Sequence, residues 1–116
     1  MRILTLLTVI AVVALGADYY LSNNWMLRTY PANGTVNVPM DAQITANWKG
    51  NRGNNLGMAL HYADAPQDYI YGTVAGSEHG LSFQPDHNLD PGRHIVVNVD
   101  AGRRHYQFTF TTIREP

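Results

Sequence analysis

The five histidines are the residues of this chain best suited to metal binding or acid–base chemistry, because the sequence contains no cysteine. They are His61, His79, His87, His94 and His105. No two of them have the His-x-His or His-Glu-x-x-His spacing that brings neighbouring side chains to one metal ion. His61 and His94 alternate with apolar residues, which predicts that both face solvent. We therefore interpret the histidines as isolated surface residues and predict no metal site.

The remaining polar residues do not form a known catalytic pattern either. No serine lies in a Gly-x-Ser-x-Gly turn, and no glycine cluster has the spacing of a nucleotide-binding loop. Asp64, Asp86 and Asp90 lack the dense acidic pattern of a calcium loop. We therefore expect no enzyme activity, no catalytic or cofactor-binding residue, no cofactor and no small-molecule substrate.

Four aromatic residues admit a second interpretation. Tyr62, Tyr69, Tyr71 and Trp48 have the residue types of an aromatic carbohydrate-binding face. Packing in the core and along sheet edges explains the same residues with fewer assumptions, because large aromatic side chains bury much apolar area. We prefer the packing interpretation.

The N-terminal segment predicts export of the chain. Arg2 precedes an uncharged apolar run from Ile3 to Ala17. Read as a signal peptide, the segment has a small-residue site at 14–16. Read as a membrane anchor, residues 3–21 form a helix of roughly 28 Å, about one hydrocarbon thickness. We prefer a retained anchor in a bacterial inner membrane, with a cytoplasmic N-terminus and a periplasmic or external domain. Its aromatic belt would be Tyr19, Tyr20 and Trp25.

The rest of the chain is patterned as strands. The most regular stretch is 89–112, in which two alternating apolar runs flank a turn near Gly102 and so predict a β-hairpin. Further strand-like runs precede it at 8–12-residue spacing from Val36 onward, and one of them is predicted as a single strand at 69–76. We expect an anchor at 1–21, a connector at 22–28 and a domain at 29–113. The predicted fold is all-β, a seven-stranded sandwich preceded by one transmembrane helix.

Several motifs in this domain resemble those of bacterial immunoglobulin-like domains of cell-surface and surface-layer proteins. The resemblance covers 28–113 and implies an immunoglobulin-like β-sandwich that acts as a structural or adhesive module. Many such domains carry a tyrosine at the start of the sixth strand, where this sequence has Ile95, so a tyrosine corner is not expected. The matching segments are Tyr30–Gly34, Val38–Ile44, Leu81–Pro85, Leu89–Gly92 and Phe108–Thr112.

A second resemblance is to periplasmic copper-carrier proteins, which are small sandwiches. It rests on the fold and on the segment Pro31-Ala32-Asn33-Gly34. Those proteins use an N-terminal histidine and an Asp-Gly-His-like segment. Here no histidine lies near the start of the domain, and the segment from Asp100 to His105 departs from that spacing.

The loop charges predict two oppositely charged ends. If the strands alternate up and down, five basic residues share the end where the domain begins, against two acidic ones there. The opposite end holds six acidic residues, five aspartates and Glu115, against two basic ones, Arg93 and Arg114. We predict that the first end faces the membrane or a partner. This basic end comprises Arg28, Lys49, Arg52, Arg103 and Arg104, and the acidic end comprises Asp41, Asp64, Asp68, Asp86 and Asp90.

These features lead to one functional expectation with two alternatives. The net charge of −1 does not indicate nucleic-acid binding. A retained anchor and a short connector favour a non-catalytic accessory or scaffolding subunit of a membrane protein complex, with the membrane and other subunits as partners. A photosynthetic reaction-centre antenna complex or a respiratory complex would be a plausible host. The alternatives are a secreted or cell-surface adhesion module and a periplasmic copper carrier.

Overall fold

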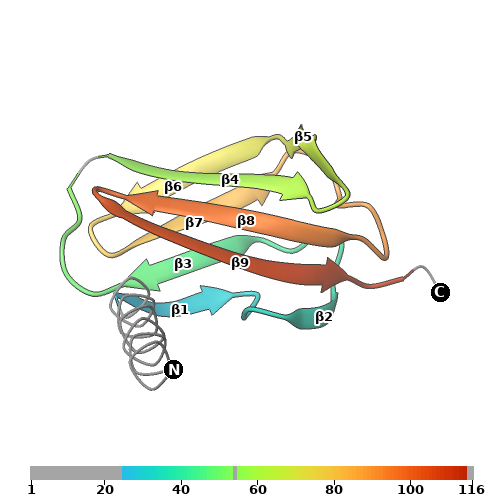
Figure 1. Ribbon diagram of the computed structural model, residues 1–116, viewed down its shortest axis with the longest axis horizontal. Helices are drawn as coiled ribbons and strands as arrows, with labels where there is room; N and C mark the ends of the chain where they lie inside the picture. Colours follow the sequence, from blue (N-terminus) through green and yellow to red (C-terminus); the bar gives the residue numbers. More distant parts are fainter. Residues whose placement is uncertain (1–24, 54, 115–116) are drawn as a thin grey trace, which may run out of the picture.

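Nine β-strands make up the part of the chain that the computed structural model describes, residues 25–53 and 55–114 (Figure 1). The strands of the core, such as β3 and β8, follow alternating runs, which suit a pleated surface buried on one face. The strands are β1 (Met26–Tyr30), β2 (Thr35–Val38), β3 (Ile44–Trp48), β4 (Leu56–Tyr62), β5 (Ala65–Ile70), β6 (Gly72–Ser77), β7 (Gly80–Pro85), β8 (His94–Ala101) and β9 (Arg104–Thr112).

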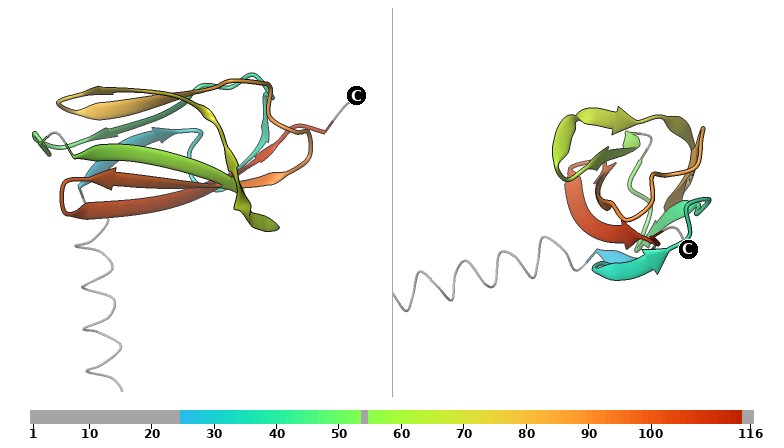
Figure 2. Two further views of the ribbon diagram at one scale, coloured as in Figure 1. Left: turned by 90° about the horizontal axis from the view of Figure 1, so that it is seen from above. Right: turned by 90° about the vertical axis from the view of Figure 1, so that its right-hand side faces the viewer.

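The strands form two sheets packed face to face. One sheet has the order β1-β3-β7-β6 and the other the order β2-β9-β8-β4-β5. All pairings are antiparallel except that of β2 with β9. Figure 2 shows the two layers enclosing a common interior when the molecule is seen from its end. The prediction of an all-β sandwich is therefore confirmed.

The predicted hairpin forms as β8–β9, and its turn lies at 102–103. Cross-strand pairs run from His94 opposite Thr111 to Ala101 opposite Arg104. Ile95, Val97 and Val99 point into the core and are fully buried. Gly102 occupies the turn with a φ of 60°, a conformation that glycine adopts without steric cost. The predicted apolar stripe is thus the centre of the core.

The number of strands differs from the predicted seven. The predicted strand 69–76 is in fact two strands, because the chain leaves the five-stranded sheet after β5 and enters the other sheet at β6. Tyr71 lies at this crossing, where its carbonyl accepts a hydrogen bond from the Asp86 backbone N–H. The split gives one of the two extra strands, and β1 is the other. It pairs with β3 from Met26 onward and so begins inside the segment predicted to be a connector.

Trp25 belongs to the core. Only 4% of it is exposed. Its ring packs against Trp48, with centroids 5.8 Å apart, and meets Tyr106 edge-on at 6.4 Å. The prediction of Trp25 as a membrane-belt residue was therefore wrong, because the indole covers the end of the sandwich instead of a lipid interface. The sandwich begins by residue 25 and not at 29.

Tyr19, Tyr20 and the predicted anchor at 1–21 lie outside the described residues. Within the described ranges, no helix has the length and apolar character needed to cross a membrane.

Candidate functional site

The outer face of the five-stranded sheet carries polar pairs that span β8 and β9. Side chains here alternate with the core residues, so the residues directly opposite each other meet on the solvent side. The Gln107 amide nitrogen donates to Asn98 Oδ1 at 3.0 Å. Thr111 and His94 are hydrogen-bonded at 2.7 Å. The third pair, Asp100 with His105, lies next to the turn of the hairpin.

The Asp100–His105 pair has the geometry of an oriented metal ligand. His105 Nδ1 lies 2.8 Å from Asp100 Oδ1. Because a carboxylate only accepts hydrogen bonds, Nδ1 must be the donor, and this leaves the lone pair on Nε2 when the ring is neutral. Metal-binding histidines are commonly held in this way by a carboxylate on the other ring nitrogen. His105 is 57% exposed, so its ring is accessible from solvent.

The other histidines do not converge on this pair. His61 packs edge-on against Tyr69 at 6.1 Å, and its Nδ1 is buried without a hydrogen-bond partner in the described structure. His79 Nδ1 contacts the Gly50 carbonyl at 3.1 Å, and its Nε2 lies 3.9 Å from Glu78. Across residues 25–53 and 55–114, no three histidine, aspartate or glutamate side chains come together in a metal-binding group.

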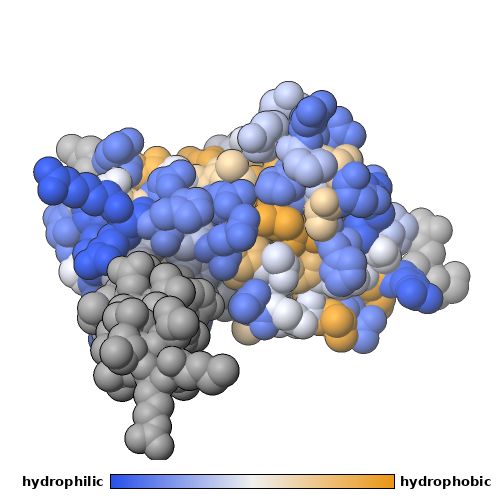
Figure 3. Space-filling model, viewed as in Figure 1, coloured by the Kyte–Doolittle hydropathy of each residue, from blue (hydrophilic) through white to orange (hydrophobic). Residues whose placement is uncertain are grey.

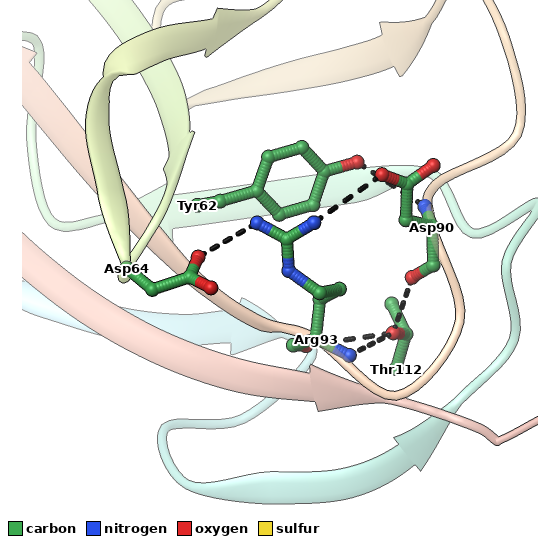
Figure 4. Close-up of polar contacts among 5 residues, drawn as sticks. All are labelled: Tyr62, Asp64, Asp90, Arg93 and Thr112. Carbon is green, nitrogen blue, oxygen red and sulfur yellow. Dashed lines mark hydrogen bonds and ion pairs between the residues drawn. The ribbon is translucent and has the colours of Figure 1, made fainter.

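A second polar cluster surrounds Arg93 at the opposite end of the hairpin (Figure 4). Its guanidinium lies 2.6 Å from Asp64 Oδ1 and 3.5 Å from Asp90 Oδ2. It also stacks on the Tyr62 ring, 4.2 Å from the centroid. The hydrogen bond from Arg93 lowers the pKa of the Asp64 carboxyl, and the same bond raises the pKa of Arg93. The cluster joins the β4–β5 turn to the β7–β8 loop.

Backbone contacts complete this cluster. The Tyr62 hydroxyl accepts the Asp90 backbone N–H at 3.1 Å. Thr112 Oγ1 donates to the Asp90 carbonyl at 2.6 Å and accepts the Arg93 backbone N–H at 2.9 Å. Ile95 does sit where a tyrosine corner would need a tyrosine, yet Tyr62 on β4 supplies a comparable hydroxyl-to-backbone bond from another strand. These bonds fasten the β7–β8 loop to the sandwich.

The predicted basic residues lie on loops and strands around one end of the sandwich. Backbone hydrogen bonds tie this end together, from Lys49 to the Trp25 carbonyl and from Gly102 to the Asn55 carbonyl. The Arg52 guanidinium covers the Trp25 ring at 5.5 Å. Arg103 and Arg104 lie at the β8–β9 turn, and Arg28 is exposed on β1. A membrane- or partner-facing role for this end stays a prediction.

The predicted acidic residues lie around the other end. The Leu89 backbone N–H donates to the Met40 carbonyl, which places Asp41 beside the β7–β8 loop that carries Asp86 and Asp90. Asp64 joins this group through Arg93, and Asp68 lies on the neighbouring strand β5. Figure 3 shows a face that is mostly hydrophilic, with apolar surface near its centre.

The four aromatic residues considered for a binding face separate into two groups. Trp48 is buried in the core. Tyr62, Tyr69 and Tyr71 instead line one pocket of about 250 Å³ between β5 and the β7–β8 loop. The packing interpretation is therefore correct for Trp48, which lies in the core. Tyr69 and Tyr71 are instead 56% and 78% exposed.

Sequence reasoning missed the Asp100–His105 contact because it compared residue spacing along the chain. The signal was present in the hairpin: a two-residue turn at 102–103 pairs residue 101 with 104 and therefore residue 100 with 105. The apparent break in spacing between Asp100 and His105 does not separate their side chains.

Comparison with known proteins adds the fold relationship. No protein-family model and no curated protein matches the sequence. Among solved structures, CopC from Methylosinus trichosporium OB3b matches with a TM-score of 0.58 at 9% identity, over 79% of this chain and 95% of that one. L,D-transpeptidase 3 from Mycobacterium tuberculosis matches with a TM-score of 0.48 at 13% identity, over 77% of this chain but only 37% of that one.

The expectation of an accessory subunit in a membrane complex was wrong, since the solved structure whose fold matches most of this chain is CopC and not a subunit of such a complex. That expectation depended on a predicted anchor and on an apparent lack of site chemistry. The anchor lies outside the described residues, and the Asp100–His105 pair supplies a candidate ligand that the sequence spacing did not reveal. At 9% identity, what the comparison establishes is the fold: this chain contains a β-sandwich of the kind found in CopC.

Proposed function

We propose that this chain is an exported, periplasmic β-sandwich protein that binds copper(II) at His105. The observation that carries the proposal is the 2.8 Å hydrogen bond between His105 Nδ1 and Asp100, which directs the free Nε2 lone pair to solvent. The fold shared with CopC supports the same proposal.

The chemistry of the pair favours copper over other divalent ions. Imidazole and carboxylate donors bind first-row metals in an order that peaks at Cu²⁺. A copper(II) ion prefers four nitrogen or oxygen donors in a tetragonal arrangement. His105 and the Asp100 carboxylate supply two groups at most, which leaves other coordination positions to water or to a partner protein.

The surrounding charges make this a weak site. Arg103 and Arg104 flank the pair along the hairpin and disfavour an added dication. A site with few protein ligands and nearby positive charge releases its ion readily. This property suits a protein that passes copper on.

The test is a copper(II) titration of the full-length chain, followed by calorimetry and by electron paramagnetic resonance. We expect binding with an imidazole-nitrogen signature, and an affinity for Zn²⁺ that is lower than for Cu²⁺. The variant His105→Asn should lose this signature. Asp100→Asn should keep the ligand but weaken binding by about tenfold, as other changes to histidine-orienting carboxylates do.

His94→Asn is the matched control. His94 lies on the same outer face of the sheet as the Asp100–His105 pair. It also forms a hydrogen bond between β8 and β9, but its partner is the Thr111 hydroxyl and not a carboxylate. We expect this variant to bind copper as the unmodified chain does. Equal affinities for the unmodified chain and His105→Asn would rule out the proposed site.

A further inference from the structure

A second site is formed at the acidic end by what we call the tyrosine pocket. It lies between β5, the crossing to β6 and the β7–β8 loop, and has a volume of about 250 Å³. Its polar lining consists of three tyrosines, two carboxylates, one amide and one imidazole: Tyr62, Tyr69, Tyr71, Asp68, Asp90, Asn88 and His87. It is remote from His105, because β8 runs from this end to the hairpin turn at the other.

Both walls of the tyrosine pocket are held in place. The β7–β8 loop is fixed at Asp86 by the Tyr71 carbonyl, at Leu89 by the Met40 carbonyl, and at Asp90 by the Tyr62 hydroxyl. The opposite wall is β5, which pairs with β4 from Leu60 to Tyr62. A preformed pocket loses little conformational entropy when a ligand enters, so it can bind with few contacts.

Packing leaves more than half of two pocket tyrosines exposed. Tyr71 is 78% exposed and Tyr69 is 56% exposed, although both rings border a concave surface. The face of a tyrosine ring is electron-rich. Exposed aromatic faces around a cavity suit a ligand with positive charge or with flat apolar surface.

The charge of the lining selects between these ligands. Asp68 makes no ion pair with the described residues, Asp90 shares its charge with Arg93 at 3.5 Å, and no lysine or arginine lies among the described residues that line the pocket. Asp86 adds negative charge at the same end, whereas the charge of Asp64 is paired with Arg93. An aromatic cage with carboxylates beside it attracts cations through both the ring faces and the acids.

The molecule already contains one example of this recognition. The Arg93 guanidinium stacks on the Tyr62 ring at 4.2 Å while pairing with Asp64 and Asp90. Tyr69, Tyr71 and Asp68 offer the same residue types on the pocket side, where no lysine or arginine is among the described residues of the lining.

We propose that the tyrosine pocket binds an organic cation, an ammonium or guanidinium group. The cation is either a free small molecule or the arginine or lysine side chain of a partner. This site is independent of copper binding at His105.

The test is a chemical-shift titration of the full-length chain with four probes. Choline represents a free organic cation and N-acetyl-arginine-methylamide represents a basic side chain. The neutral isostere 3,3-dimethylbutan-1-ol has the shape of choline without its charge, and N-acetylglucosamine tests a saccharide ligand. We expect a cation to shift the signals of Tyr69, Tyr71 and Asn88 and the neutral isostere to leave them in place. Tighter binding of choline would identify a small ligand, and tighter binding of the blocked arginine would identify a partner side chain.

Variants separate the pocket from general effects. Tyr71→Ala and Asp68→Asn change exposed side chains, so both should fold, and each should weaken binding by about tenfold, the loss of one cation–π or charge contact. The control Tyr30→Ala removes a half-exposed tyrosine on β1, and His105→Asn removes the copper ligand; both should bind the cation unchanged. No shift with either cation, equal binding of the neutral isostere, or binding of the saccharide alone would overturn the proposal.

Discussion

Arg93 organises more of its surroundings than any other charged residue among those that the structure describes. One guanidinium contacts two carboxylates and a tyrosine ring, and its backbone is bonded to Thr112. The cluster is largely exposed, so its ion pairs are screened and individually weak. Its main contribution is to hold the β7–β8 loop, which forms one wall of the tyrosine pocket.

Acid should weaken this cluster in a predictable direction. Arg93 holds the pKa of Asp64 below its ordinary value of 3.8. The folded state therefore gains stability from ionised Asp64 above that value and loses it as pH falls through the lowered pKa. In urea unfolding from pH 7 to pH 2, Asp64→Asn should be less stable than the unmodified chain at neutral pH and should converge with it at the acid limit.

Asp68→Asn is the control for this prediction. Asp68 is an exposed aspartate at the same end, and it makes no ion pair with the described residues. Its variant should follow the pH dependence of the unmodified chain. If both variants show the same dependence, the Asp64–Arg93 pair contributes nothing specific.

At the scale of single elements, the alternating runs predicted the strands that carry the core. The hairpin β8–β9 and the buried faces of β3 and β4 follow directly from period-two patterns. The pattern failed at Tyr71, because residues 69–76 alternate as if they formed one strand. The break depends on a long-range contact with Asp86 and on a change of sheet, neither of which leaves a local signal.

Gly72 on β6 lies where the neighbouring strand leaves no room for a side chain. A Cβ on Gly72 would clash with the Gln84 carbonyl oxygen and lie 2.7 Å from the Phe83 ring. We expect Gly72→Ala to separate β6 from β7 and to lower the free energy of unfolding by about 1–3 kcal/mol, the usual cost of overpacking. The loss should be visible in urea unfolding at neutral pH.

Gly57→Ala on β4 is the matched control for Gly72→Ala. A Cβ at this position meets no atom within 4 Å. Alanine there should be neutral or stabilise the strand slightly, because it restricts the unfolded chain. Equal losses for the two variants would mean that the space around Gly72 does not matter.

At the scale of the whole molecule, the charge separation follows from topology. Successive strands reverse direction except at the β1–β2 and β5–β6 junctions, where the chain changes sheets and continues the same way. The connections at one end carry the basic residues and those at the other end the acidic ones. The two proposed sites lie at different ends as a result. His105 is beside Arg103 and Arg104, whereas the tyrosine pocket shares its end with the aspartates.

The boundary of the domain was the least predictable feature. Residues 22–28 are a short polar and aromatic segment between an apolar run and the first obvious strand, so nothing local marks Trp25 as a core residue. Its burial depends on Trp48, Tyr106 and Arg52, which come from three distant parts of the chain. Only the assembled sandwich shows that the fold needs this residue.

Trp25 should therefore be required for stability. Trp25→Ala removes a large buried side chain and should lower the free energy of unfolding by about 3–5 kcal/mol. Trp25→Phe should cost less, because it keeps an aromatic ring and removes an indole N–H that has no hydrogen-bond partner among the described residues. Leu27→Ala, two residues away on β1 and 61% exposed, should change stability by no more than about 0.5 kcal/mol. Thermal and urea unfolding of the three variants would decide the matter: if Trp25→Ala unfolds like Leu27→Ala, the indole does not close the end of the core.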